Sequence, residues 1–183
     1  NLADFPFADP ALGEFEVVAQ VRNGTLAFAE AWPALEDFAG ELRFERQAME
    51  IVGRSARSLG LALSGARAVI PSLNSSATLT VTGDAQGTSA AFLDYVRRSP
   101  VQRAIGGLPA GVDADGRGQL RLRLELPLSD LSKTKVAGEY RFAGNTLRLG
   151  PRLPPVERAS GRLRFTESSI QLRNGSARFA GGP

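Results

Sequence analysis

The segment RGQLRLRLEL, residues 117–126, alternates apolar and polar side chains along nearly its whole length. One side of an extended strand would carry its leucines: Leu120, Leu122, Leu124 and Leu126. The other side would carry its ionic residues: Arg121, Arg123 and Glu125. A period of two predicts a strand of an antiparallel sheet, with one apolar face and one face in water.

The same period recurs along most of the chain. Further alternating segments are residues 14–22, 40–46, 138–142, 146–149, 161–165 and 169–173. We therefore predict a mainly β fold, built as a long antiparallel meander. Three dipeptides between alternating runs are interpreted as two-residue hairpin turns: Asn23-Gly24, Gly144-Asn145 and Asn174-Gly175.

One part of the chain departs from this period. The stretch TSAAFLDYVRRS, residues 88–99, places its large apolar residues on one face of a helix. The candidate capping residues are Thr88 or Ser89 for this helix, and Ser99 with Gln102, as a capping box around Pro100, for the next. Two short α-helices are thus predicted, near residues 89–98 and 100–105.

An internal repeat links two distant parts of the sequence. The segment PALEDFAGELRF at residues 33–44 is similar to PPVERASGRLRF at residues 154–165, which lies 121 residues later (154 minus 33). Between residues 25 and 60, twelve positions are identical to those 121 residues later, without a gap. The repeat predicts one full unit over about 14–134 and the start of the next over about 135–183, within a longer protein whose units stack along one axis.

Composition removes several classes of catalytic and metal site. The 183 residues include no histidine and no cysteine, so catalytic triads and zinc sites that need these side chains are excluded. The net charge is +3, and nearly all cations are arginines spaced along the predicted strands. We interpret them as a solvated outer face and expect no nucleic acid partner.

The apolar face raises a question of coverage. A one-layer sheet must cover its apolar side, and two short helices cannot cover about a dozen strands. One solution is a sandwich, whose interior is filled by its own side chains. The other is a sheet that curls into a groove or trough and holds something apolar that is not protein. The sequence leaves both open.

Five motifs, in order, resemble the YhdP-like proteins of the AsmA-like superfamily. They are NGTLAF (23–28), AWPALEDFAGELRF (31–44), YVRRSPV (95–101), LELPLS (124–129) and LPPVERASGRLRF (153–165). The resemblance implies a repeating β-groove in the periplasm, anchored to the inner membrane by a segment outside this chain. It also implies a role in carrying phospholipid between the inner and outer membranes.

On this resemblance, phospholipid acyl chains would lie along the apolar face. The expected lining residues are Val17, Val21, Leu42, Phe44, Leu120, Leu122, Leu124, Tyr140, Phe142, Leu163 and Phe165. Contacts with components of either membrane would come from other parts of the longer protein. The alternative is a structural or assembly scaffold for outer-membrane protein biogenesis, in which a sheet edge accepts a partner strand.

An enzyme is the third reading of the sequence, and it is the least supported. Asp113 and Asp115 are spaced like cation-binding carboxylates, but the remaining ligands of a calcium loop do not follow. A glycine-rich turn before the strand at 117–127 explains them better. We therefore expect no catalytic residues, no metal and no cofactor.

Overall fold

The computed structural model describes residues 13–28, 31–105 and 107–179. Its strands are β1 (Glu16–Leu26), β2 (Leu35–Glu45), β3 (Ala48–Ser58), β4 (Leu61–Ile70), β5 (Thr78–Thr88), β6 (Asp113–Asp115), β7 (Arg117–Pro127), β8 (Lys135–Arg148), β9 (Val156–Thr166) and β10 (Ile170–Phe179). The helices are α1 (Ser89–Arg97), α2 (Val101–Ala104) and the 3-10 turn η2 (Leu131–Lys133).

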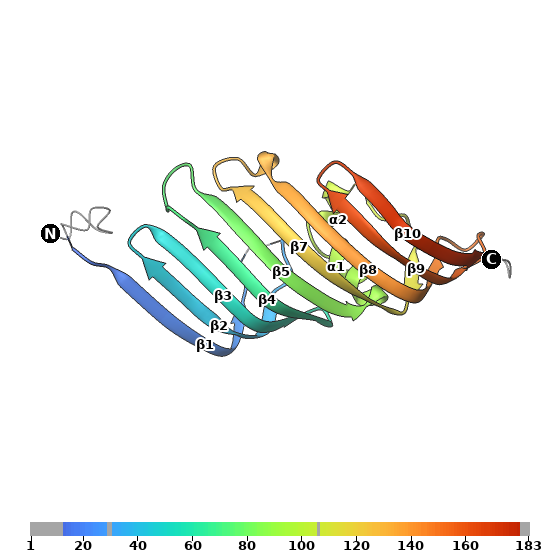
Figure 1. Ribbon diagram of the computed structural model, residues 1–183, viewed down its shortest axis with the longest axis horizontal. Helices are drawn as coiled ribbons and strands as arrows, with labels where there is room; N and C mark the ends of the chain where they lie inside the picture. The colour runs from blue at the N-terminus through green and yellow to red at the C-terminus, as the bar shows by residue number, and fades with distance from the viewer. Residues whose placement is uncertain (1–12, 29–30, 106, 180–183) are drawn as a thin grey trace.

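All ten strands belong to one antiparallel sheet, in the order β1-β2-β3-β4-β5-β7-β8-β9-β10, with the short β6 beside the end of β8. Figure 1 shows β1 and β10 at opposite ends of the long axis. Each strand pairs with its neighbour in sequence, apart from the helical insertion between β5 and β7. The predicted mainly β meander is confirmed.

The three dipeptides interpreted as hairpin turns lie inside strands instead, so that prediction is wrong. Asn23, Gly144 and Asn174 have φ values of 54°, 69° and 52° within β1, β8 and β10, where the pairing register shifts. Both a tight hairpin and a β-bulge need a residue that tolerates left-handed backbone, which Asn and Gly do. A true two-residue hairpin is Leu59-Gly60, between β3 and β4, where both φ values are positive.

The repeat in sequence is also a repeat in pairing. The register of β1 with β2 shifts between Val21, Gly24 and Leu26, and that of β8 with β9 shifts 121 residues later. Asp37 and Arg158, also 121 apart, both have a φ of 50°. Because bulges bend strands and increase their twist, both groups of strands curve in the same way.

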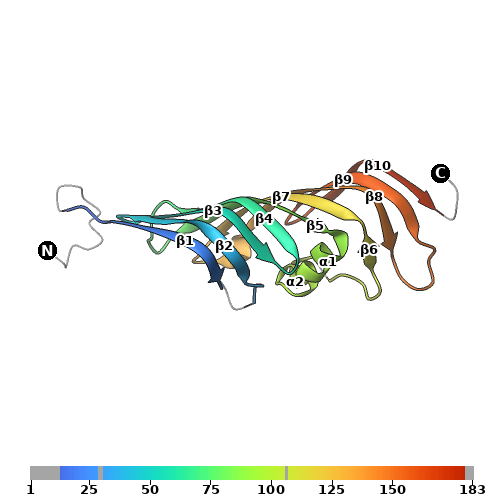
Figure 2. The ribbon, with the colours of Figure 1, turned by 90° about the horizontal axis from the view of Figure 1, so that it is seen from below.

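Helices α1 and α2 lie together on one face of the sheet (Figure 2). The side chain of Thr88 caps α1 by accepting a hydrogen bond of 3.1 Å from the Ala91 N–H. The capping box predicted for α2 is absent. Ser99 Oγ bonds to the Val96 carbonyl at the end of α1, and Gln102 Oε1 accepts from the Leu108 N–H. Neither side chain therefore caps the first turn of α2.

The described chain forms a single layer with a small core. Its large buried apolar side chains are Phe38, Leu61 and Ile70, and its other buried apolar residues are alanines. The chain exposes 11737 Å² of surface, whereas a compact protein of 19.4 kDa exposes about 8,500 Å². The filled sandwich, one of the two solutions left open by the sequence, is therefore not the structure.

Candidate functional site

The strand register places the predicted apolar residues on one face. Residues directly opposite one another in an antiparallel pair point to the same side of the sheet. One row of such partners runs Ala19, Leu42, Ile51, Ala68, Val81, Leu124 and Val136, from β1 to β8. A second row runs Ala85, Leu120, Tyr140, Leu163 and Leu172, from β5 to β10. The two rows share strands β5, β7 and β8, so the face continues from one end of the sheet to the other.

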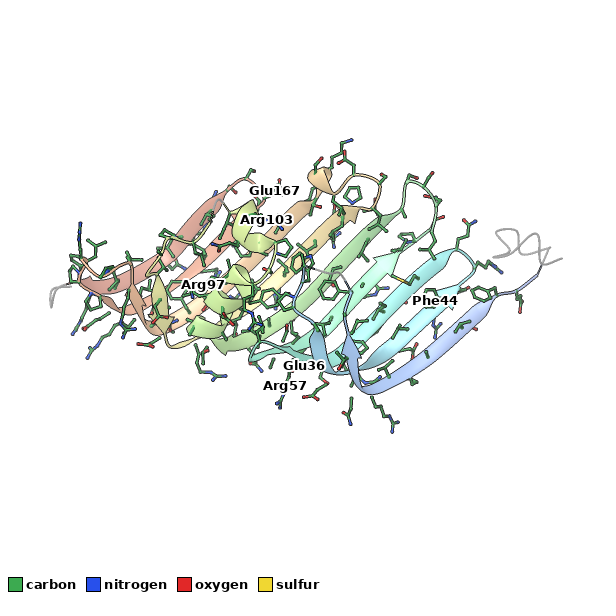
Figure 3. All side chains as sticks on the ribbon, turned by 180° about the vertical axis from the view of Figure 1, so that it is seen from behind. Glu36, Phe44, Arg57, Arg97, Arg103 and Glu167 are labelled. Carbon is green, nitrogen blue, oxygen red and sulfur yellow. The ribbon has the colours of Figure 1, made fainter. Side chains whose placement is uncertain are left out.

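The remaining predicted residues join this apolar face. Val17 pairs with Phe44, and Val21 with Gly40. Leu122 pairs with Gly138, which pairs in turn with Phe165, and Phe142 pairs with Gly161. Figure 3 looks onto this face, with Phe44 far from the two helices that carry Arg97 and Arg103.

None of the eleven predicted residues is buried. Ten of them are half-buried, and Val17, near the β1 edge, is 44% exposed. Side chains in a filled core would be shielded almost completely. The apolar face is therefore an open surface, along which an apolar molecule can make contact without displacing protein side chains.

Several residues of the same face were missed by the sequence analysis. They are Phe38, Met49, Ile51, Leu63, Ile70, Leu79, Val81 and Val136. Midway along β3 and β4, the alternation between the two faces shifts by one residue. Gly53, which pairs with Ala66, and the buried Ala56 lie on the same face although they are three residues apart. The sequences of these strands therefore do not alternate cleanly. Tracing the pattern separately on either side of Gly53 and Gly65 would have found them.

Glycines on the apolar face allow aromatic rings to lie flat on the sheet. A side chain at Gly138 would overlap the ring of Phe165, and one at Gly118 would overlap the ring of Tyr140. The same holds for Gly40, which lies beneath Phe38. Rings that cover glycines protect the backbone and keep the face smooth. The surface therefore has few projecting side chains that would block movement along it.

A chain of aromatic rings covers one part of the face. Phe28 and Trp32, from the β1–β2 connection, are 5.9 Å apart, and Trp32 is 6.5 Å from Tyr95 on α1. Phe92 of α1 meets Tyr140 of β8 edge to face at 5.0 Å. Trp32 is thus a packing residue, and α1 encloses one side of the open surface.

A buried polar contact fixes α1 to the sheet. Ser89 Oγ lies 2.8 Å from the Tyr140 hydroxyl and accepts a hydrogen bond of 2.6 Å from Asn145 Nδ2. Burial raises the pKa of Tyr140 above its usual 10.0, and the hydrogen bond to Ser89 opposes this shift only in part. The hydroxyl therefore stays neutral at ordinary pH, and the aromatic wall carries no charge.

Local ion pairs join many of the charged side chains on the opposite face, the polar face. Arg121 pairs with Asp84 at 3.2 Å, and Arg67 pairs with Glu50 at 2.6 Å. Glu139, whose side chain is only 18% exposed, is shared by three arginines: Arg141 at 2.6 Å, Arg164 at 2.8 Å and Arg162 at 3.5 Å. Hydrogen bonds from Arg164 and Arg141 lower the pKa of Glu139 from 4.5 to about 2.

The Glu139 carboxylate should make stability depend on pH in a defined window. Because its pKa is lowered on folding, its contribution is complete above pH 4.5 and is lost as pH falls from 4.5 to about 2. The difference in melting temperature between the wild type and Glu139→Gln should be largest near neutral pH and vanish near pH 2. A difference that stays constant across this window, measured by circular dichroism, would contradict the assigned ion pairs.

Asp113 and Asp115 do not form a cation site in the structure. Both lie on β6 and pair with Arg148, Asp115 at 2.7 Å and Asp113 at 3.6 Å. Among the described residues there is no group of three or more acidic side chains that could hold a metal ion. The two aspartates therefore fasten β6 to the end of β8.

Comparison with known proteins identifies the family of this chain. Within the described residues, no helix is both long and apolar enough to cross a membrane. A family model described as YhdP protein matches residues 1–183. The intermembrane phospholipid transporter YhdP of Escherichia coli (strain K12) is 30% identical over 159 residues, which cover 87% of this chain and 12% of that protein. No solved structure matches the chain. The chain therefore belongs to the YhdP family.

Proposed function

We propose that the chain is one segment of a conduit that carries phospholipid across the periplasm between the inner and outer membranes. The observation that carries the proposal is the open apolar face, which runs through every long strand of the sheet. The name of the Escherichia coli relative as a phospholipid transporter supports it. An anchor in the inner membrane and the contacts with both membranes would be supplied by parts of a longer protein.

Acyl chains would lie on the apolar face and head groups would remain in water. Burial of one methylene gains about 0.8 kcal/mol, so a chain of about 16 carbons that covers one side of its surface gains on the order of 5 kcal/mol. This is enough for capture and is similar at neighbouring positions, because each strand presents the same kind of side chain. The binding free energy of the lipid therefore changes little along the sheet, and no deep minimum traps the lipid at one position.

The proposal requires no reaction and no fixed stoichiometric site. The eleven lining residues named from the sequence, with Met49, Ile51 and Val81, would form the path. The aromatic wall of Trp32, Tyr95 and Phe92 would limit the path on one side. The other side would be open to water, where head groups of different size can be accommodated.

Photo-crosslinking in cells tests this path. A photoreactive amino acid at 44 or 165, in the full-length protein, is expected to capture phospholipid, whereas the same residue at 43 or 164 is not. Phe44 and Phe165 lie on the apolar face, and their neighbours Arg43 and Arg164 lie on the polar face. All four positions are accessible. A difference in lipid capture therefore shows which face of the sheet the lipid contacts, and does not arise from a difference in solvent exposure.

Equal capture at all four positions would show that lipid is merely adsorbed. Capture of a protein strand at positions of the β1 or β10 edge, with no lipid at 44 or 165, would instead favour the scaffold. Lipid capture is read by mass spectrometry of the crosslinked protein, which also identifies the head group.

A further inference from the structure

Three arginines lie directly opposite one another on the polar face of β8, β9 and β10. Arg141 pairs with Arg162 in the register, and Arg162 pairs with Arg173. We call these three residues the arginine row. Like charges in directly opposed positions destabilise a sheet. The row is therefore a local conflict that the fold tolerates.

The nearby acidic side chains do not balance the arginine row. Arg141, Arg162 and the adjacent Arg164 share one carboxylate, Glu139. The guanidinium of Arg173 bonds only to the neutral Gln171, at 3.3 Å, among the described residues. Elsewhere on this face the pairing is closer to one cation per acid, as in Arg67 with Glu50. The last three strands of this face thus carry an excess of positive charge.

The repeat shows that the fold itself does not need these arginines. At an offset of 121, the positions of the row are Gln20, Glu41 and Val52, which pair across β1, β2 and β3 in the same register. The same backbone geometry is therefore built without any cation at these positions. The shared backbone geometry does not by itself account for the arginines of β8–β10.

A hollow of about 740 Å³ lies next to Arg164, beside the row, although none of the three row residues lines it. Its lining includes Arg121, Arg123, Glu139, Arg164 and Gln171. A smaller hollow of about 250 Å³, lined in part by Gln119 and Arg141, adjoins the row on the β7 side. Both hollows are open, so an extended segment can lie across the strands with its side chains next to the row.

We propose that this surface, the arginine row with Arg164 and the adjoining hollow, docks an acidic segment of a protein partner. Guanidinium groups bind carboxylates by paired hydrogen bonds. A protein segment can place carboxylates at the row and neutral side chains elsewhere. A continuous phosphate surface, of a membrane or a nucleic acid, would also meet Asp84, Glu125 and Glu139 on the same face and be repelled. The surface lies on the side of the sheet opposite to the apolar face, so the lipid path stays free.

The test uses a fluorescent hexaglutamate peptide and the whole chain at low ionic strength. The combined substitutions Arg141→Gln, Arg162→Gln and Arg173→Gln are expected to weaken binding by about tenfold or more. A control with Arg22→Gln, Arg43→Gln and Arg67→Gln has the same net charge but keeps the row, and its affinity should change by less than about twofold. Equal losses in the two variants, or no binding by the wild type, would overturn the proposal.

Two further measurements separate docking from other roles of the arginines. Vesicles containing phosphatidylglycerol and a single-stranded oligonucleotide should bind more weakly than the peptide, and tighter row-dependent binding of either would overturn the choice of a protein partner. Arg162 lies opposite both Arg141 and Arg173, so Arg162→Gln removes both pairs of opposed like charges. The melting temperature of this variant should be unchanged or higher. A fall of several degrees would mean that the row stabilises the fold, and the docking role would be rejected.

Discussion

Replacing Leu122 by aspartate is expected to abolish lipid capture while the sheet stays folded. Leu122 is half-buried on the apolar face, and its partners on β5 and β8 are Gly83 and Gly138, which have no side chains. A carboxylate there can reach water, so we expect unfolding to become easier by only about 1 kcal/mol. A bound acyl chain would have to cover that charge, at a cost of several kcal/mol. Lipid crosslinking at positions 44 and 165 and chemical denaturation measure the two effects.

The matched control is Leu61→Asp. Leu61 also belongs to the sheet but is 3% exposed, in the small core beneath Gly87 and next to α1. An aspartate at this position should cost more than about 4 kcal/mol, because the charge has no access to water. If Leu122→Asp unfolds the chain as severely as Leu61→Asp, the apolar face is an ordinary core and the conduit is wrong for this segment.

Gly40→Ala should destabilise the sheet by about 2–3 kcal/mol through overpacking. A Cβ at Gly40 would lie 2.5 Å from the Val52 carbonyl oxygen and 2.6 Å from Phe38 Cζ. The oxygen belongs to the backbone of β3 and cannot move without breaking the pairing of β2 with β3. Phe38 is itself buried, so it has no free space into which to turn.

Gly161, the equivalent of Gly40 in the second copy of the repeat, provides the comparison. A Cβ there would lie 2.9 Å from Leu172 Cδ1 and 3.3 Å from Phe142 Cζ, the ends of side chains on the open face. Gly161→Ala should therefore cost less than about 1 kcal/mol, because Leu172 is 59% exposed and can turn away. Urea denaturation of both variants measures the difference, and equal losses would contradict the packing described for β2 and β3.

The strands that alternate cleanly could be predicted with their faces. In β7 and β9 the leucines Leu120, Leu122 and Leu163 are each followed by an arginine, and the register confirms that Leu122 and Phe165 share one side. The helices were predicted to within a few residues, because they depart from this period and because Thr88 caps the first of them. The caps themselves were predicted only in part, since Ser99 and Gln102 bond to residues that the sequence does not show to be close.

Alternation and the ungapped offset are enough to predict antiparallel strands with one apolar face and a repeat of 121 residues. Alternation fixes which side each residue faces, and an ungapped offset fixes the same order of bends in both copies. The pairing of neighbouring strands makes the Asn-Gly positions bulges, and the packing of the whole sheet leaves the apolar face open. Neither follows from the local sequence. The same left-handed residue serves a turn or a bulge, depending on where the neighbouring strand ends. Likewise, an alternating strand looks the same whether or not a second layer covers it, because coverage is set by the bends of the whole sheet and by what packs against it.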